Sequence, residues 1–372
     1  MTKMRTAFAL VVFAVCALLA PATAQAAGPV PATLPAATGK YAVGSDTLHL
    51  TDRSRTDPWV PESGPRQLMV SMFYPAVLPV GAPRQYLSTE EATLFLQGIP
   101  DVRPELVAAT RSGARLAAPP VPRPHGFPLV VLSPGFGHPR SALTGLAEEL
   151  ASRGYVIALI GHNYESNGTQ FPDGQVTGCV ACESEQVEMV PTVRAADVSF
   201  VLDRLLGRDP AWAGRWLIDP RRIGMAGHSI GGNSASATMS VDRRVLAGVN
   251  MDGSFIEPVP ESGLDRPFLM LGTAQSHTPS GEDTSWPQAW SRLTDWKRWL
   301  TVAGAGHSSF TDLSVLGEHF GVKDPTETIS GARATELTRA YLVAFFEENL
   351  RGRPQPLLEG PVPANPEVEF WS

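Results

Sequence analysis

The 372-residue sequence has little cysteine, few charged residues and no excess of basic ones. It contains three cysteines, 18% of its residues are charged, and Lys and Arg number 30 against 37 Asp and Glu, a net charge of −7. This acidity gives no general electrostatic reason to bind nucleic acid or an anionic membrane. Because 43% of the residues are hydrophobic, the chain can bury the core of a large globular protein.

No apolar run is long enough to span a bilayer, and the longest one lies at the N-terminus. Lys3 and Arg5 precede the apolar residues 7–20, and small residues around Ala24 and Ala26 follow. These are the three parts of a secretory signal peptide, and the apolar run is too short for a stable membrane anchor. We therefore expect a signal peptide over residues 1–26, cleavage near Ala26 and secretion of the mature chain.

Only Cys179 and Cys182 remain once the signal peptide is removed, and they are spaced C-x-x-C. In a reducing compartment this spacing would suggest a redox site or half of a zinc site. The sequence has no second cysteine pair that would complete a zinc site. In a secreted chain a small structural disulfide is favoured, and we expect neither a metal nor an organic cofactor.

Strand and helix patterns alternate behind a Pro- and Ala-rich lead over residues 27–39. This alternation predicts a single α/β domain over residues 40–372, with a mostly parallel sheet flanked by helices on both faces. A Pro-rich stretch over residues 81–128 predicts an insertion or a long connection. Apolar runs predict strands at 68–74, 129–132, 155–160, 223–226, 246–251, 268–271 and 299–302, and helical periodicity predicts helices near 143–150, 198–205 and 337–345.

The motif that carries chemistry is Gly227-His228-Ser229-Ile230-Gly231, which follows one of these short strands and precedes a helix-compatible segment. In this context G-x-S-x-G is typical of a nucleophile elbow, a tight strand-to-helix turn that exposes a serine. Gly227 and Gly231 would relieve the crowding of the backbone in such a turn. The alternative is a Gly-rich turn with a helix-capping serine, and the context favours Ser229 as a nucleophile.

A serine hydroxyl needs a base, because it is a poor nucleophile at neutral pH. The candidate is His307, which follows the last expected strand in a Gly-flanked loop; His277, also behind a strand, is its main rival. The base in turn requires a carboxylate that fixes its tautomer. Asp252 follows the first strand after the nucleophile helix and fits the order nucleophile, acid, histidine, and Asp283 is the alternative.

Attack on an ester carbonyl also requires hydrogen-bond donors for the oxyanion. One donor should be the backbone N–H of Ile230, at the start of the nucleophile helix. The second should come from the loop Ser133-Pro134-Gly135-Phe136-Gly137, behind a central strand. Pro134 has no N–H to donate, and the two glycines permit a sharp turn, so Phe136 is the candidate.

Three segments carry a family resemblance: GFPLVVLSPGFGHPRSALTG, DPRRIGMAGHSIGGNSASATMSV and GAGHSSF. They resemble the branch of the α/β-hydrolase fold that contains plasma-type platelet-activating-factor acetylhydrolases and related bacterial lipases. The resemblance implies that Ser229, Asp252 and His307 are the catalytic residues and that Phe136 and Ile230 are the oxyanion donors. The chain departs from the family where Pro134-Gly135 replaces the usual His-Gly opening of the oxyanion loop.

We therefore expect a secreted serine carboxylic-ester hydrolase, a lipase or esterase that cleaves hydrophobic or lipid esters through an acyl-enzyme. The substrate class depends mainly on the resemblance. A cutinase- or polyester-type hydrolase is the rival among enzymes, although it usually takes its acid from the later strand. A catalytically silent α/β hydrolase that binds a ligand is the rival outside enzymes. The expected partner is a small-molecule or lipid ester; no nucleic acid and no stable membrane anchor are expected.

Overall fold

The computed structural model describes residues 30–322 and 324–372, so the predicted signal peptide lies outside the described residues. Residues Pro31–Ser372 form one compact unit. Its strands are β1 (Ala42–Thr56), β2 (Pro65–Ala76), β3 (Arg115–Leu116), β4 (Phe127–Ser133), β5 (Val156–His162), β6 (Thr169–Gln170), β7 (Val176–Thr177), β8 (Ile218–His228), β9 (Val245–Met251), β10 (Phe268–Thr273), β11 (Lys297–Val302) and β12 (Val368–Trp371). Its helices are α1 (Thr89–Phe95), α2 (Pro104–Ala108), α3 (Thr144–Ser152), α4 (Val190–Leu206), α5 (Ile230–Val241), α6 (Ser285–Arg292), α7 (Asp312–Phe320) and α8 (Gly331–Arg351).

A large sheet forms the centre of this unit, with the strand order β12-β11-β10-β9-β8-β4-β5-β2-β1-β3. The six strands from β5 through β11 in this order are parallel, whereas β2 and β12 pair antiparallel at either side of them. Strands β4, β5 and β10 are buried along their whole length and are largely apolar, as the continuous hydrophobic runs predict. The C-terminal ends of the parallel strands meet at one edge of the sheet, where open α/β sheets place ligand sites.

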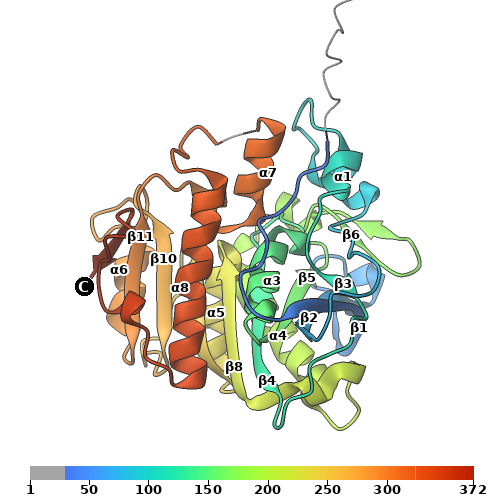
Figure 1. Cartoon of the computed structure of the whole chain (residues 1–372), viewed down its shortest axis with the longest axis horizontal. Coiled ribbons are helices and arrows are strands. Elements are labelled where there is room, and N and C mark those ends of the chain that lie inside the picture. The colour runs from blue at the N-terminus through green and yellow to red at the C-terminus, as the bar shows by residue number, and fades with distance from the viewer. Residues whose placement is uncertain (1–29, 323) are drawn as a thin grey trace, which may run out of the picture. The chain divides into compact units, whose positions relative to one another are not determined.

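Helices cover both faces of the sheet (Figure 1). The apolar faces of α3 and α8 pack on one side, against side chains of the central strands. Those of α4, α5 and α6 pack on the other side, where Trp286 and Trp299 are among the largest buried side chains. The predicted α/β class, with a mostly parallel sheet between two helical layers, is confirmed.

The stretch between β2 and β4, which was expected to be an insertion or a connection, contains α1, α2 and β3. Helix α1 begins at a capping box, in which Ser88 and Glu91 bond each other's backbone N–H groups. The apolar side chains of α1 and α2 form a small cluster with Leu316 of α7. This cluster lies outside the two main cores and brings α7, which follows His307 in the chain, close to α1.

Candidate active site

Ser229 occupies a strained turn between β8 and α5. Its backbone angles are φ 55° and ψ −130°, a conformation that non-glycine residues rarely adopt. A Cβ at Gly227 would lie 2.1 Å from the carbonyl of Gly231, and a Cβ at Gly231 would lie 2.2 Å from the carbonyl oxygen of Ser133. Both glycines are therefore required by the close approach of the backbone, and their role in a nucleophile elbow stays a prediction.

Asp252 lies directly beside this turn, one residue after β9. The N–H of Ser229 donates to the carbonyl oxygen of Met251 at 2.7 Å, and a Cβ at Gly253 would lie 2.0 Å from the carbonyl oxygen of Ser229. These contacts bind the elbow to the end of the neighbouring strand on both sides of Asp252. Asp252 itself has a positive φ of 59°, so both residues depart from ordinary backbone geometry where strands β8 and β9 end.

His307 is bound to the Asp252 carboxylate, with 2.6 Å between its Nδ1 and Oδ2. The Nδ1–H donates to this carboxylate, which leaves Nε2 as the unprotonated nitrogen of the neutral ring. The side chain of His307 is 50% exposed, whereas that of Asp252 is 3% exposed. Within residues 30–322 and 324–372, His307 makes no hydrogen bond to Ser229 Oγ, a bond that in free enzymes is often loose until substrate binds.

His228, the neighbour of the serine, holds the backbone of His307. Its Nε2 donates to the carbonyl oxygen of His307 at 2.8 Å, and the centroids of the two rings are 4.5 Å apart. Burial, together with the imidazoles of His307 and His138, keeps the pKa of His228 well below its ordinary value. A neutral, buried His228 therefore fixes the position of His307.

The two residues considered as rivals, His277 and Asp283, belong to the same hydrogen-bonded chain. His277 lies between two carboxylates, with Nδ1 2.6 Å from Oδ1 of Asp252 and Nε2 3.2 Å from Oδ2 of Asp283. The N–H of Thr273 adds a third bond to Asp252, at 2.7 Å. Burial would raise the pKa of Asp252, but bonds from His277 and His307 hold it at about 2, so this carboxylate is ionised at neutral pH.

The expected oxyanion donors lie on two segments that pack against each other. Ile230 begins α5, and a Cβ at the next residue, Gly231, would lie 2.2 Å from the carbonyl oxygen of Ser133 and 2.6 Å from that of Pro134. Phe136 lies in the loop between β4 and α3. The next residue, Gly137, donates its N–H to the carbonyl oxygen of Glu165 at 3.0 Å and so fixes the loop on the far side of Phe136.

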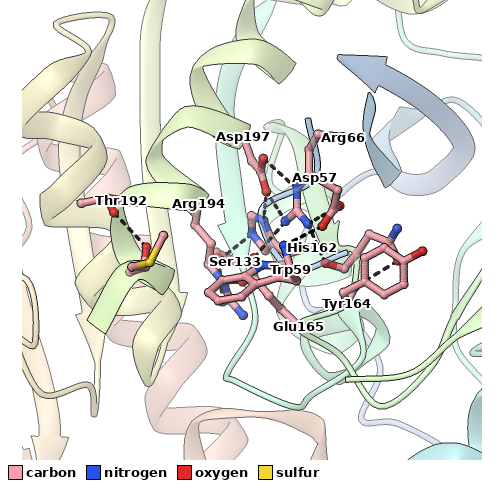
Figure 2. Close-up of polar contacts among 12 residues, drawn as sticks. Asp57, Trp59, Arg66, Ser133, His162, Tyr164, Glu165, Thr192, Arg194 and Asp197 are labelled. Atoms are coloured by element: carbon pink, nitrogen blue, oxygen red, sulfur yellow. Dashed lines mark hydrogen bonds and ion pairs between the residues drawn. The ribbon is translucent and has the colours of Figure 1, made fainter. Parts of the chain in front are cut away.

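A buried ionic cluster supports the loop that contains Phe136, the expected oxyanion loop (Figure 2). Arg194 of α4 donates to the carbonyl oxygen of Pro134 at 2.5 Å, to Ser133 Oγ at 3.2 Å and to the Glu165 carboxylate at 2.7 Å. Each side chain of this group is at most 1% exposed. The group, called the ionic cluster below, consists of Asp57, Arg66, His162, Glu165, Arg194 and Asp197. Sequence reasoning did not find this cluster, because its residues come from four separate stretches of the chain and no local pattern marks them.

Cys179 and Cys182 form the predicted disulfide. It lies near the oxyanion loop: a Cβ at Gly137 would be 3.6 Å from Cys182 Sγ, and the N–H of Ala181 donates to the carbonyl oxygen of Tyr164. The C-x-x-C loop therefore forms part of the surroundings of the site.

Two cavities flank His307. One, of about 570 Å³, is polar and is lined by Asp252, His277, Asp283 and His307, among others. The other, of about 310 Å³, is lined mainly by apolar side chains of α1, α2 and α7, and includes Ser308, the neighbour of His307. The site thus has a polar and an apolar side. In the part of the chain that the structure describes, no helix has the length and apolar character needed to cross a membrane.

Comparison with known proteins gives the family. A model of the alpha/beta hydrolase family matches residues 130–363, and one of platelet-activating factor acetylhydrolase, isoform II, matches residues 30–196. The probable 1-alkyl-2-acetylglycerophosphocholine esterase of Arthroderma benhamiae is 28% identical and the match covers 96% of this chain and 98% of that protein. The platelet-activating factor acetylhydrolase of Cavia porcellus is 22% identical, over 60% of this chain and 58% of that protein.

A solved structure, a ferulic acid esterase from Streptomyces cinnamoneus, is 43% identical and superposes with a TM-score of 0.82 over 92% of this chain and all of the other. The predicted resemblance to platelet-activating factor acetylhydrolases and the predicted ester hydrolase activity are confirmed. With a family match over more than half its length and a close structural relative, the chain belongs to the alpha/beta hydrolase family.

Proposed function

We propose that the protein is a secreted serine esterase in which Ser229 is the nucleophile, His307 the general base and Asp252 the carboxylate that orients it. The observation that carries this proposal is the 2.6 Å bond between His307 Nδ1 and Asp252, formed beside a serine held at φ 55°. A carboxylate on Nδ1 directs the basic Nε2 away from itself, as a hydroxyl nucleophile requires.

The reaction follows from these positions. Ser229 Oγ attacks the ester carbonyl while Nε2 of His307 accepts its proton, and the backbone N–H groups of Phe136 and Ile230 donate to the oxyanion. His307 then gives the proton to the leaving alcohol, which departs and leaves an acyl-enzyme. Water then attacks the acyl carbon while His307 accepts its proton, the bond between the acyl carbon and Ser229 Oγ breaks to release the acid, and His307 returns the proton to Oγ.

The apolar cavity supports a hydrophobic ester as substrate. Its lining includes Ser308, the residue after His307, so a hydrocarbon or aromatic group of a substrate bound at the site can be buried there. The apolar residues of the lining include Phe95, Leu96, Ile99, Leu313, Leu316 and Phe320. Two relatives of known name support two ester classes: a lipid ester, as in the alkylacetylglycerophosphocholine esterase, and an ester of an aromatic acid, as in the ferulic acid esterase.

Replacement of the nucleophile tests the proposal. We expect Ser229→Ala to lower kcat for p-nitrophenyl esters by a factor of about 10⁶ while the protein stays folded. Ser240→Ala, which removes an exposed hydroxyl at the far end of the same helix, is the matched control and should keep full activity. Near wild-type turnover by Ser229→Ala would exclude the proposed mechanism. Rates on acyl chains of increasing length, measured beside a feruloyl ester, distinguish the two ester classes.

A further inference from the structure

The proposed mechanism does not use the second imidazole on Asp252. We propose that His277 is a positioning residue: held as an imidazolium between Asp283 and Asp252, it fixes the Asp252 carboxylate toward His307 and offsets part of its negative charge. This inference depends on the proposed function, because it concerns how the base is kept active. Asp283 is the residue that in turn holds His277.

Hydrogen-bond chemistry determines the protonation of His277. Both of its ring nitrogens face carboxylate oxygens, at 2.6 Å for Asp252 and 3.2 Å for Asp283. An ionised carboxylate only accepts hydrogen bonds, so both nitrogens donate only if both carry protons. Burial lowers the pKa of His277, but the two carboxylates outweigh burial and raise it to about 9. The ring is therefore a cation at neutral pH.

The surroundings keep this ring in place and exclude it as the base. Its plane stacks on Trp286 of α6 with centroids 4.2 Å apart, and Trp299 of β11 donates to its backbone carbonyl at 2.7 Å. The side chain is 6% exposed and both nitrogens are occupied. His277 therefore has no nitrogen free to accept the proton of Ser229. His307, whose side chain is half exposed, keeps its Nε2 free for this proton.

The charged groups around His277 come from each of the elements that meet there. Asp252 follows β9, Asp283 precedes α6 and His307 follows β11. Glu282 and Asp324 line the polar cavity beside them. Acidic groups thus surround His277, and among the described residues His307 is the other imidazole bonded to the Asp252 carboxylate. Asp252 accepts from both rings, one on each oxygen.

We expect the positive charge of His277 to extend the pH range in which the enzyme is active toward lower pH. A cation on one oxygen of Asp252 weakens the pull of that carboxylate on a proton of His307. His307 must be neutral to accept the proton of Ser229, so the neighbouring cation keeps it active in more acidic solution. Without the cation, the full charge of Asp252 favours protonated His307, and activity is lost at a higher pH.

The test is the pH dependence of kcat/KM for His277→Gln and Asp283→Asn. Gln at 277 retains a donor for Asp252 and removes the charge. The acidic limb, the pH below which kcat/KM falls, should therefore move up by about 0.5 to 1 pH unit. Asp283→Asn keeps an acceptor for Nε2 but weakens the protonation of His277, so its limb should move in the same direction by less. Asp265→Asn, which removes a surface carboxylate paired with Arg243, is the control and should leave the limb in place.

Two results would overturn the inference. One is an acidic limb at the wild-type pH in both variants, which would reduce His277 to a packing role; the other is a limb that moves to lower pH. If His277→Gln fails to fold, Asp283→Asn, at a residue only partly buried, decides alone. Labelling of Ser229 in the wild type by a fluorophosphonate separates this failure from failure of the proposed function, because labelling depends on an activated serine.

Discussion

The acid–histidine chain at the rim of the sheet and the ionic cluster under the oxyanion loop are built from similar charges in different ways. In the first, imidazoles alternate with carboxylates, Asp283–His277–Asp252–His307, and the chain ends in a half-exposed ring. In the second, arginines face carboxylates with both fully buried. Histidine exchanges protons near neutral pH and arginine does not. A proton can therefore move at the rim, whereas charge under the loop is fixed.

The buried cluster also shows how a histidine is kept from titrating. His162 bonds Asp197 at 2.9 Å and Ser133 Oγ at 3.0 Å, yet burial, with Arg194 beside it, lowers its pKa. It thus remains a neutral hydrogen-bonding link to the oxyanion loop. His277 lies between two carboxylates and, in the described part of the chain, has no arginine beside it comparable to Arg194, and its pKa is raised instead. The arrangement of neighbours, more than the residue type, decides whether a ring is charged.

The hydrogen-bonded series Asp283–His277–Asp252–His307 can be broken at Asp252. Asp252→Asn should lower kcat by about 10⁴, because an amide at this position favours the wrong tautomer of His307. Asp283→Asn, one imidazole further away, should cost little activity at the pH optimum. Steady-state rates on one p-nitrophenyl ester, with both variants shown to be folded by circular dichroism, check this difference. If Asp283→Asn caused the larger loss, the acid would be misassigned.

The buried cluster can be broken at Arg66, which bonds Asp57, Glu165 and Asp197. Arg66→Met leaves these carboxylates buried without their shared cation, and we expect the free energy of unfolding to fall by about 3–5 kcal/mol. Arg243→Met removes an arginine from an exposed pair with Asp265 and should cost about 0–1 kcal/mol. Urea denaturation of the two variants measures the contrast. Equal, small losses would show that the cluster is not held together by this arginine.

Much of the fold could be predicted because the parallel strands have a local signal. The continuous apolar runs of β4, β5 and β10 indicate strands buried on both faces, and the periodicity of α3, α4 and α8 indicates their apolar faces. Strand β1 was not predicted, because its sequence AVGSDTLHLTDRSRT has no continuous apolar run. It lies near the edge of the sheet, where half-exposed strands carry polar residues.

In the candidate site, too, the parts with a local sequence signal could be predicted and the parts without one could not. Ser229, Asp252 and His307 each follow a strand, so the meeting of strand ends predicts that they lie together, and their catalytic roles remain predictions. The link of His277 to both Asp252 and Asp283 was not predicted, since the sequence presents them as competing candidates. Nor does any spacing join Arg66 to Asp197, 131 residues away. Charged residues are rarely fully buried, so no local pattern marks such a pair.

The most direct test of the account is whether Ser229 is activated by the residues around it. A fluorophosphonate should label the wild-type protein on Ser229, identified by mass spectrometry of the digested protein. Labelling should vanish in Ser229→Ala and become far slower in Asp252→Asn, because only a serine with a correctly oriented base attacks the probe. Label on another residue, or equal rates for wild type and Asp252→Asn, would contradict the account.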